Sequence, residues 1–404
     1  MKLPTPDRIF TGVLAALLAT ATLTSCKKSP TPASTDSTDA SAPSSKGSKA
    51  PAGPAPIRIG EFTSLTGVNA SFGQSTHKGS TLAVEEINAK GGVLGRPLEL
   101  VTRDNQSKAG ETSIIVRDLI SREKVVALIG EIASRRSLEA APIAQDSGIP
   151  MISPASTNER VTLTGNCIFR ICFTDGFQGR VLSKFLSSLG VKKVAILVDN
   201  AQDYSVGLSE NFRKAFTESG GQIVSEQSYS SGDKDFRSQL TAIKAQNPEA
   251  VLLPNYYTEA PLVVRQARQL GIDVPFVGGD GWDSTELVTL GGDAMEGSFF
   301  SNHFAPESEK AAVQQFVKAY RDKYQTDPDA IAALGYDAVG VLADAITRAG
   351  STDPIPLLEA LAGTKEFPAV TGNITMDENR NPTKSAVIIR VEGGKFRYLE
   401  TVTP

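Results

Sequence analysis

The sequence predicts an α/β protein built from doubly wound parallel sheets. Within residues 125–158, two short apolar runs (125–130 and 150–153) flank a segment with helical spacing of apolar side chains (135–146). Fully apolar short strands joined by a helix are typical of a parallel sheet covered on both faces. The same alternation runs from Ile57 through most of the chain and supplies too many units for one sheet, so we expect two α/β lobes.

Each unit is recognised by its apolar pattern and by the Gly, Pro, Asn or Ser residues at its ends. Besides the two strands above, the patterns predict strands at 57–63, 98–103, 168–173, 193–199, 222–229, 250–253, 275–278, 298–301, 385–391 and 395–401. They predict helices ending at Ala89 and spanning 109–122, 135–146, 177–189, 206–219, 234–245, 259–270, 307–324, 330–349 and 355–362, with a short one from Ser284. Residues 64–74, rich in Gly, Ser and Asn, are expected to form a loop.

Length and composition are those of an ordinary globular protein. The 404 residues are enough for two domains, and 40% of them are hydrophobic and 21% charged. The formal charge is −4, and the lysines of the first 56 residues leave the remainder still more acidic. An acidic body without a basic stripe argues against nucleic-acid binding.

The N-terminus has the features of a targeting segment. Lys2 and Arg8 precede an apolar run (9–23) that is short for a membrane span and ends in Leu23-Thr24-Ser25-Cys26. This ending resembles a bacterial lipobox, so we expect residues 1–25 to be a signal peptide and Cys26 to carry the lipid anchor. Buried acyl chains contribute about 0.8 kcal/mol per methylene, which anchors a protein without a spanning helix. Residues 26–56, almost entirely Ser, Thr, Pro, Ala, Gly, Lys and Asp, are predicted to be a disordered linker.

Two cysteines remain beyond the anchor, Cys167 and Cys172. Residues five apart in a strand point to opposite faces, so a local disulfide is disfavoured. We expect two small, buried, apolar side chains.

Small hydroxyl residues follow the two strands of the opening segment. Ser134 follows the first, at a helix N-cap position, and Ser156 and Thr157 follow the second. The carboxyl edge of an open α/β sheet is where ligands bind, and a helix N-terminus favours anions. These residues therefore predict a seat for a small carboxylate, although Ser and Thr also cap helices and turns without any ligand.

Aromatic and acidic residues occupy the corresponding strand ends of the second series. Tyr204 and Tyr256 each follow a strand, and Phe72 lies in the first expected loop. Asp280, flanked by glycines and followed by Trp282, is a candidate counter-ion for a ligand cation; the alternative is a turn aspartate.

The chain lacks common catalytic and cofactor motifs. It contains no phosphate-binding G-x-x-x-x-G-K-[ST], no G-x-G-x-x-G and no G-x-S-x-G. His77 and His303 are the only histidines, and we expect a surface residue and a structural residue respectively. We therefore predict no enzyme, no metal and no cofactor. A hydrolase would require a serine or a carboxylate pair beside one of the two histidines.

Several phrases resemble the type I periplasmic solute-binding proteins of ATP-binding cassette transporters, in the leucine/isoleucine/valine-binding branch. They include GEFTSLTG, AVEEINAKGGVLGRPLELVTRDNQS, GIPMISPASTN, FRICFTDGFQG, VDNAQDYSVG, RQARQLG and GGDGW. The resemblance implies two lobes joined by a three-strand hinge. It places residues 57–174 and 302–386 in the first lobe, and 175–301 and the tail 387–404 in the second.

The resemblance also implies roles for individual residues. The ligand carboxylate would be held by Ser134 and Thr157, and the ammonium by the Ala155 carbonyl, the Thr157 hydroxyl and Asp280. Tyr204 and Tyr256 would close the site from the second lobe.

Two departures from the family pattern leave the ligand's side chain open. Asp280 stands where the branched-chain binders carry Glu, one methylene longer. Arg135 and Arg136 stand where small residues are usual, and either a cleft-facing arginine or a solvated helix face is consistent with the sequence.

The function expected is that of an extracytoplasmic lipoprotein, monomeric, that captures a branched-chain-like amino acid and delivers it to a membrane permease. The alternatives are a ligand-binding subunit of a sensor system and a binder of a small amide or organic acid.

Overall fold

The computed structural model describes residues 54–403. The predicted signal peptide, Cys26 and all but the last three residues of the predicted linker lie outside the described residues.

The strands follow the predicted order. They are β1 (Ile57–Thr63), β2 (Leu98–Asp104), β3 (Ala127–Ile129), β4 (Met151–Ser153), β5 (Ile168–Arg170), β6 (Lys193–Asp199), β7 (Gln222–Tyr229), β8 (Ala250–Leu252), β9 (Phe276–Gly278), β10 (Phe299–Asn302), β11 (Ala386–Glu392) and β12 (Lys395–Val402).

Helices separate most of these strands. They are α1 (Ala70–Ala89), α2 (Glu111–Ser121), α3 (Ser134–Asp146), α4 (Arg160–Leu163), α5 (Asp175–Ser188), α6 (Asp203–Glu218), α7 (Arg237–Ala245), α8 (Ala260–Gln269), η1 (Asp280–Trp282), α9 (Thr285–Gly291), η2 (Gly292–Met295), α10 (Ala311–Tyr324), α11 (Ala330–Ala349) and α12 (Pro354–Ala362).

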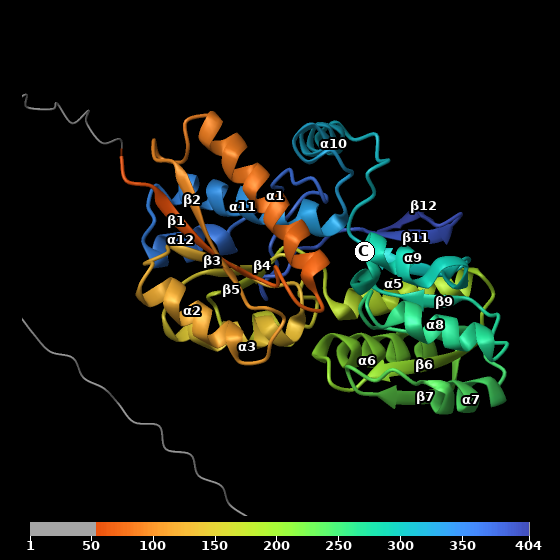
Figure 1. Ribbon diagram of the computed structural model, residues 1–404. Coiled ribbons are helices and arrows are strands. Elements are labelled where there is room, and N and C mark those ends of the chain that lie inside the picture. The colour runs from red at the N-terminus through yellow and green to blue at the C-terminus, as the bar shows by residue number, and fades with distance from the viewer. Residues whose placement is uncertain (1–53, 404) are drawn as a thin grey trace, which may run out of the picture. The chain divides into compact units, whose positions relative to one another are not determined.

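Two sheets organise these elements, as the alternation predicts. The first is fully parallel, with strand order β2-β1-β3-β4-β5 (Figure 1). The second has the order β12-β11-β10-β9-β8-β6-β7; it is parallel from β7 to β10 and ends in an antiparallel β11–β12 hairpin. We call the first sheet with its helices the first lobe, and the second sheet with its helices the second lobe.

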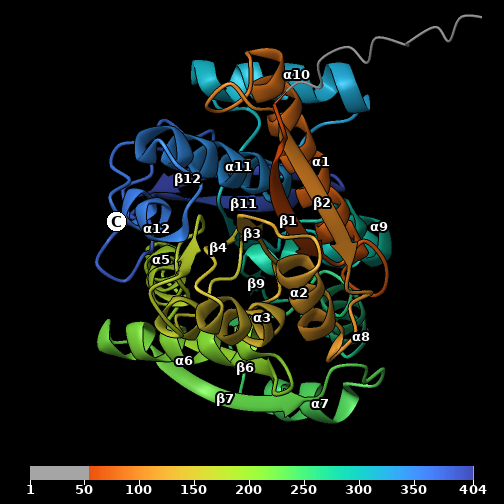
Figure 2. The same ribbon diagram turned by 90° about the vertical axis from the view of Figure 1, so that its left-hand side faces the viewer.

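Helices cover both faces of the first sheet, which is what its apolar strands require. One cluster of buried side chains joins the sheet to α2 and α3, and another joins its opposite face to α1 and α11 (Figures 1 and 2). In the second lobe, α5 packs against α6 and α7 against α8. The chain crosses between the lobes three times: from β5 to α5, from β10 to α10, and from α12 to β11.

The close crossing of α1 and α11 depends on two glycines. A Cβ atom on Gly79 would lie 1.9 Å from the Ala332 carbonyl oxygen, and one on Gly335 would lie 2.6 Å from the Thr76 carbonyl oxygen. Neither backbone has room for a side chain. Phe72, in the first turn of α1, is buried.

The sequence is wrong about where α1 begins. The helix starts at Ala70, inside the predicted loop 64–74, so Phe72 lies on a helix and not in a loop. Small polar residues are typical of loops, but here contacts made by this first turn outweigh that preference: the Ser71 N–H donates to the Tyr257 hydroxyl, and Phe72 is buried.

One helix of the described residues, α11, is long and apolar enough to cross a membrane. Its 18-residue apolar window is 78% buried in the fold. Buried Asp337 on this helix accepts hydrogen bonds from the N–H groups of Val370 and Thr371. This is the environment of a core helix in a globular lobe.

Candidate functional site

The candidate site lies where the β3 and β4 ends of the first sheet approach the second lobe. Ser134 is the first residue of α3, and the N-cap is Ala133, one position earlier than the sequence suggests. Its hydroxyl accepts a hydrogen bond from the Asn158 N–H at 3.3 Å, not from a residue of its own helix. Ser134 therefore joins the start of α3 to the loop after β4, residues 154–159.

Hydrogen bonds of Ser156 stabilise that loop. The Ser156 hydroxyl bonds to the Glu131 and Ile132 carbonyl oxygens at 2.9 and 3.0 Å, and its N–H donates to the Ser153 hydroxyl. Because these groups are already used, Ser156 shapes the loop instead of offering its hydroxyl to a ligand.

A buried arginine holds the same loop from beneath. Arg170, at the end of β5, donates to the carbonyl oxygens of Ser156 and Asn158 at 2.6 and 2.8 Å. This residue was not predicted from the sequence. An arginine inside the apolar run IFRICF was the available signal, because a fully buried arginine needs acceptors nearby.

Thr157 keeps an unused polar group in this setting. Thr157 is buried, and its hydroxyl has no hydrogen-bond partner among the described residues. Ala155, two residues earlier, is also buried. A buried hydroxyl without a hydrogen bond destabilises the fold unless a ligand or a water molecule supplies that bond. Thr157 is therefore positioned to bond a polar group of a ligand.

Asp280, on the second lobe, is fixed on both carboxylate oxygens. Oδ1 accepts from Gln178 Nε2 at 3.0 Å, and Oδ2 lies 2.9 Å from His303 Nε2. Its neighbour must be glycine, because a Cβ on Gly279 would lie 2.4 Å from the Tyr204 hydroxyl oxygen. Asp280 is thus a buried, oriented acid and not a solvated turn residue.

A second buried acid, Asp175, lies nearby and was not predicted. It is the first residue of α5, and its N–H donates to the Thr157 carbonyl oxygen at 2.9 Å. Neither carboxylate oxygen has a hydrogen-bond partner among the described residues. Burial raises the pKa of Asp175 well above its ordinary value, the charges of Glu159 and Asp280 raise it further, and the nearby Thr157 hydroxyl and Arg170 charge offset part of the rise. Such a group is stabilised by a cation at close range.

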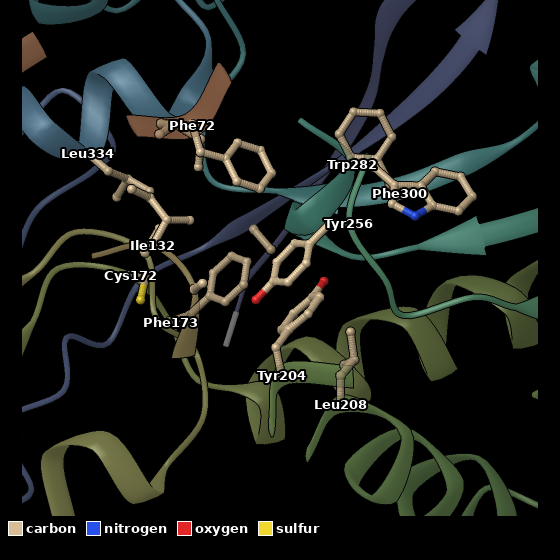
Figure 3. Packing of buried hydrophobic residues seen from close by; sticks show 14 of the residues in the cluster. Phe72, Ile132, Cys172, Phe173, Tyr204, Leu208, Tyr256, Trp282, Phe300 and Leu334 are labelled. Carbon is tan, nitrogen blue, oxygen red and sulfur yellow. The ribbon is translucent and has the colours of Figure 1, made fainter. Parts of the chain in front are cut away.

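Aromatic rings form one side of the site. Tyr204 and Tyr256 stack with their centroids 5.2 Å apart, and Phe72 meets Tyr256 edge-on at 5.9 Å. Figure 3 shows the rings of Phe72, Phe173, Tyr204 and Tyr256 turned toward one another. The Tyr204 hydroxyl accepts from the Gly281 N–H at 3.2 Å, which ties this wall to Asp280. Phe72 of the first lobe therefore lies in one cluster with Tyr204 and Tyr256 of the second, and Ser134 is linked to it through Asn158, whose side chain donates to Asp203 beside Tyr204.

Direct bonds between the lobes flank the cluster on two sides. On one side the Ser71 and Ser284 hydroxyls are 2.7 Å apart, and Asp283 accepts from the Ala330 N–H at 2.8 Å. On the other side Asn158 Nδ2 donates to the Asp203 carbonyl oxygen at 2.8 Å. The lobes are therefore closed on each other.

The two arginines after Ser134 differ in exposure: Arg135 is exposed, whereas Arg136 is not. Arg135 donates from Nη1 to the Ala201 carbonyl oxygen of the second lobe at 2.6 Å. Arg136 is largely buried, with Nη1 3.7 Å from Glu131 Oε1. Arg135 gains its acceptor from the second lobe, whereas both acceptors of Arg136, the Glu131 carboxylate and the Ser107 carbonyl oxygen, belong to the first lobe.

The two histidines occupy different environments. His77 is half-exposed and lies 2.6 Å from the buried carboxylate of Glu61. His303 is buried and contacts Asp280, so it is not remote from the site. Its other ring nitrogen has no partner among the described residues, so no Ser-His pair forms there.

The remaining predictions concern sulfur and metals. Cys167 and Cys172 are buried and unbridged, as predicted, and burial raises the pKa of Cys172 to about 12. Across residues 54–403, no group of three or more His, Cys, Asp or Glu side chains is arranged to hold a metal ion.

Two α/β lobes that close over a buried cluster of polar and aromatic side chains are typical of proteins that bind a small ligand between their domains. The comparisons with known proteins agree. The family model described as "Periplasmic binding protein" matches residues 56–395, and the chain belongs to that family. Its members are extracytoplasmic solute binders, not enzymes.

Named relatives fall in the branched-chain amino acid group. The chain is 32% identical over 325 residues to a "Leucine-, isoleucine-, valine-, threonine-, and alanine-binding protein" of Pseudomonas aeruginosa, covering 80% of this chain and 86% of that one. Its fold is similar to that of a leucine-binding protein, LivK, from Thermotoga maritima, with a TM-score of 0.83 and 41% identity over 86% of this chain and 99% of that one. It is also similar to LivJ of Streptococcus pneumoniae in complex with isoleucine, with a TM-score of 0.82 and 36% identity over 86% and 100% of the two chains.

Proposed function

We propose that this protein captures a neutral amino acid, branched-chain or of similar size, between its lobes and delivers it to an ATP-binding cassette permease. The observation that carries the proposal is the pair of complementary ends in one closed cluster. Ser134, Thr157 and the first turn of α3 offer hydroxyl and N–H groups, and Asp175, which is bonded to Thr157 through its N–H, and Asp280 offer carboxylates.

This arrangement suits a zwitterion for a physical reason. Burying an ionised carboxylate and an ammonium is costly unless each charge is met by opposite charge or by hydrogen bonds. We assign the ligand carboxylate to Ser134 and Thr157. We assign the ammonium to Asp280, Asp175 and the Ala155 carbonyl, and the apolar contacts to Phe72, Tyr204 and Tyr256. Ser156 supports the loop that carries these groups.

The ligand would act as the closing force. Residues 57–174 and 302–386 are proposed to move as one rigid lobe, and 175–301 with 387–404 as the other. A ligand that touches both lobes only when they are closed shifts the population toward closure. The permease would recognise the closed form, and a lipid at Cys26 would keep the monomeric protein beside the membrane. A gene neighbourhood encoding a kinase in place of permease subunits would favour a sensor role instead.

A small aromatic acid is the second candidate. The solute-binding protein of Rhodopseudomonas palustris in complex with benzoate has a TM-score of 0.78 and 25% identity to this chain, covering 86% of this chain and 97% of that one. An acid of that kind has no cation, so it would leave Asp175 without a partner. The amino acid is therefore favoured.

A thermal-shift screen tests the proposal. Ligands that bind only the folded state raise the melting temperature by mass action. We expect leucine, isoleucine, valine or a similar neutral amino acid to give the largest shift. A response to benzoates or simple amides alone would contradict the proposal.

A further inference from the structure

His303 occupies an unusual position for a residue of a hinge crossing. It follows β10 on the way to α10, and its side chain is fully buried. Its ring stacks on Phe173 with centroids 3.7 Å apart and planes 26° apart. Nε2 lies 2.9 Å from Asp280 Oδ2. Stacking and hydrogen bonding together fix the ring in one orientation.

The chemistry of the pair assigns the proton on this ring. An ionised carboxylate only accepts hydrogen bonds, so Nε2 carries the hydrogen that Asp280 receives. Nδ1 has no partner among the described residues. Burial lowers the pKa of His303 below its ordinary value, which favours the neutral ring at neutral pH.

We propose that His303 is a positioning residue for the ligand's cation: it donates Nε2–H to Asp280 and holds that carboxylate in the one orientation that meets an ammonium. Gln178 holds the other oxygen at 3.0 Å. Each carboxylate oxygen accepts about two hydrogen bonds, so both oxygens keep a site for the ligand while rotation of the carboxylate is blocked. The inference rests on the proposed function, since it concerns the ammonium of the same ligand.

This role explains how a short acid serves a site in which the branched-chain binders use Glu. Asp280 reaches less far, so its orientation must be set by its surroundings. His303 lies on the crossing after β10 and Gln178 lies in the first turn of α5, and each contacts a different carboxylate oxygen of Asp280. A fixed buried carboxylate favours a ligand with an ammonium over one without, because the second ligand leaves the carboxylate buried without a partner, which costs binding free energy.

Acidification should weaken the site through the same residue. Asp280 faces His303 directly, Lys384 lies close enough to lower its pKa, and Glu307, Glu309 and Lys310 line the adjacent surface hollow. A proton added at Nδ1 makes an imidazolium that neutralises Asp280. Asp280 then attracts the ligand's ammonium less strongly, so affinity for an amino acid falls as the pH drops through the folded-state pKa.

The test compares His303→Leu and His303→Gln with His77→Gln in the full chain. His77 is the matched control because it is the only other histidine and also contacts a buried carboxylate, away from Asp280. Calorimetry with leucine and with 4-methylpentanoate, which lacks the ammonium, is run at pH 7.5 and 5.5. Because a hydrogen bond to a charged group is removed, we expect His303→Leu to lose about tenfold or more in leucine affinity. Its affinity for 4-methylpentanoate should stay unchanged.

The conservative variant and the pH profile separate positioning from a merely structural role. The amide of His303→Gln still donates, so it should retain most of the leucine affinity, and because it does not titrate, its affinity should fall less than that of the wild type as the pH drops. His77→Gln should behave as the wild type. Equal losses for leucine and 4-methylpentanoate, or an unchanged His303→Leu, would overturn the inference.

Two further results decide the outcome if the variants alone do not. If His303→Leu does not fold, ¹⁵N spectra of the wild-type histidines decide: leucine should shift the protonated Nε2 of His303 and leave His77 unmoved, and an unshifted His303 overturns the inference. A wild type that binds no common amino acid overturns the proposed function and this inference with it, whereas a binding wild type with indifferent His303 variants overturns the inference alone.

Discussion

Two buried acids of the second lobe, Asp175 and Asp280, are held in different ways. Asp280 has a donor on each oxygen, and Asp175 has none among the described residues. The first is therefore stable in the closed protein without a ligand, and the second is not satisfied until a cation or a proton arrives. This difference gives the two positions opposite expected effects when each acid is replaced by its amide.

Asp175→Asn is expected to stabilise the unliganded protein and to weaken amino acid binding. The folded state holds a proton on Asp175 at pH values where the unfolded chain, with an ordinary pKa near 3.8, has lost it. Stability of the wild type therefore decreases as the pH rises above about 4 and through the raised folded pKa. The variant should lose this slope and gain on the order of 1 kcal/mol at neutral pH. Melting curves from pH 4 to 8 measure it, and a slope equal to that of the wild type would contradict the account.

Asp280→Asn is expected to abolish most of the ligand-induced stabilisation with a small effect on the unliganded protein. Its amide oxygen still accepts one of the two donors, whereas Asp280→Ala would leave both Gln178 and His303 unpaired and cost about 1–3 kcal/mol for each. The measurement is the leucine-induced shift in melting temperature for both variants. A full ligand shift in Asp280→Asn would show that the ammonium is met elsewhere.

At the scale of elements, helix crossings and hinge crossings decide which side chains meet. The strand-end pattern was sufficient to indicate Ser134, Thr157, Tyr204 and Tyr256, because residues that follow parallel strands share one edge of a sheet. The same pattern did not indicate Asp175 or His303 as residues of the site. They lie at or beside the segments that pass between lobes, and only the relative placement of the two sheets brings them to the site.

The interface between α1 and α11 offers a stability prediction with an internal control. Gly335 and Gly340 are both within α11, but a Cβ on Gly335 meets the Thr76 backbone at 2.6 Å, whereas one on Gly340 meets only the Phe367 ring at 3.3 Å. Gly335→Ala should lower stability by about 2–4 kcal/mol, as overpacking against backbone does. Gly340→Ala should be neutral or gain up to about 1 kcal/mol from helix propensity. Urea denaturation measures both, and equal stabilities would contradict the tight crossing.

At the scale of the whole molecule, most of the fold was predictable and the closed state was not. Apolar periodicity indicated the alternating units, and it located α11 at its observed bounds. It failed at the start of α1, whose first turn is stabilised by Tyr257 of the other lobe. The sequence left Arg135 open between a cleft-facing and a solvated side chain, because its acceptor, the Ala201 carbonyl oxygen, belongs to the other lobe.

The central claim is that a closed pair of lobes matches both charges of one small ligand. It is tested most directly by calorimetric titration of the wild-type protein with three ligands. Leucine carries both charges, 4-methylpentanoate carries only the carboxylate, and 3-methylbutylamine carries only the ammonium. We predict that leucine binds and that each half-ligand binds about 100-fold more weakly, because each leaves buried groups at one end unpaired. Binding of either half-ligand within a few-fold of leucine would contradict the account.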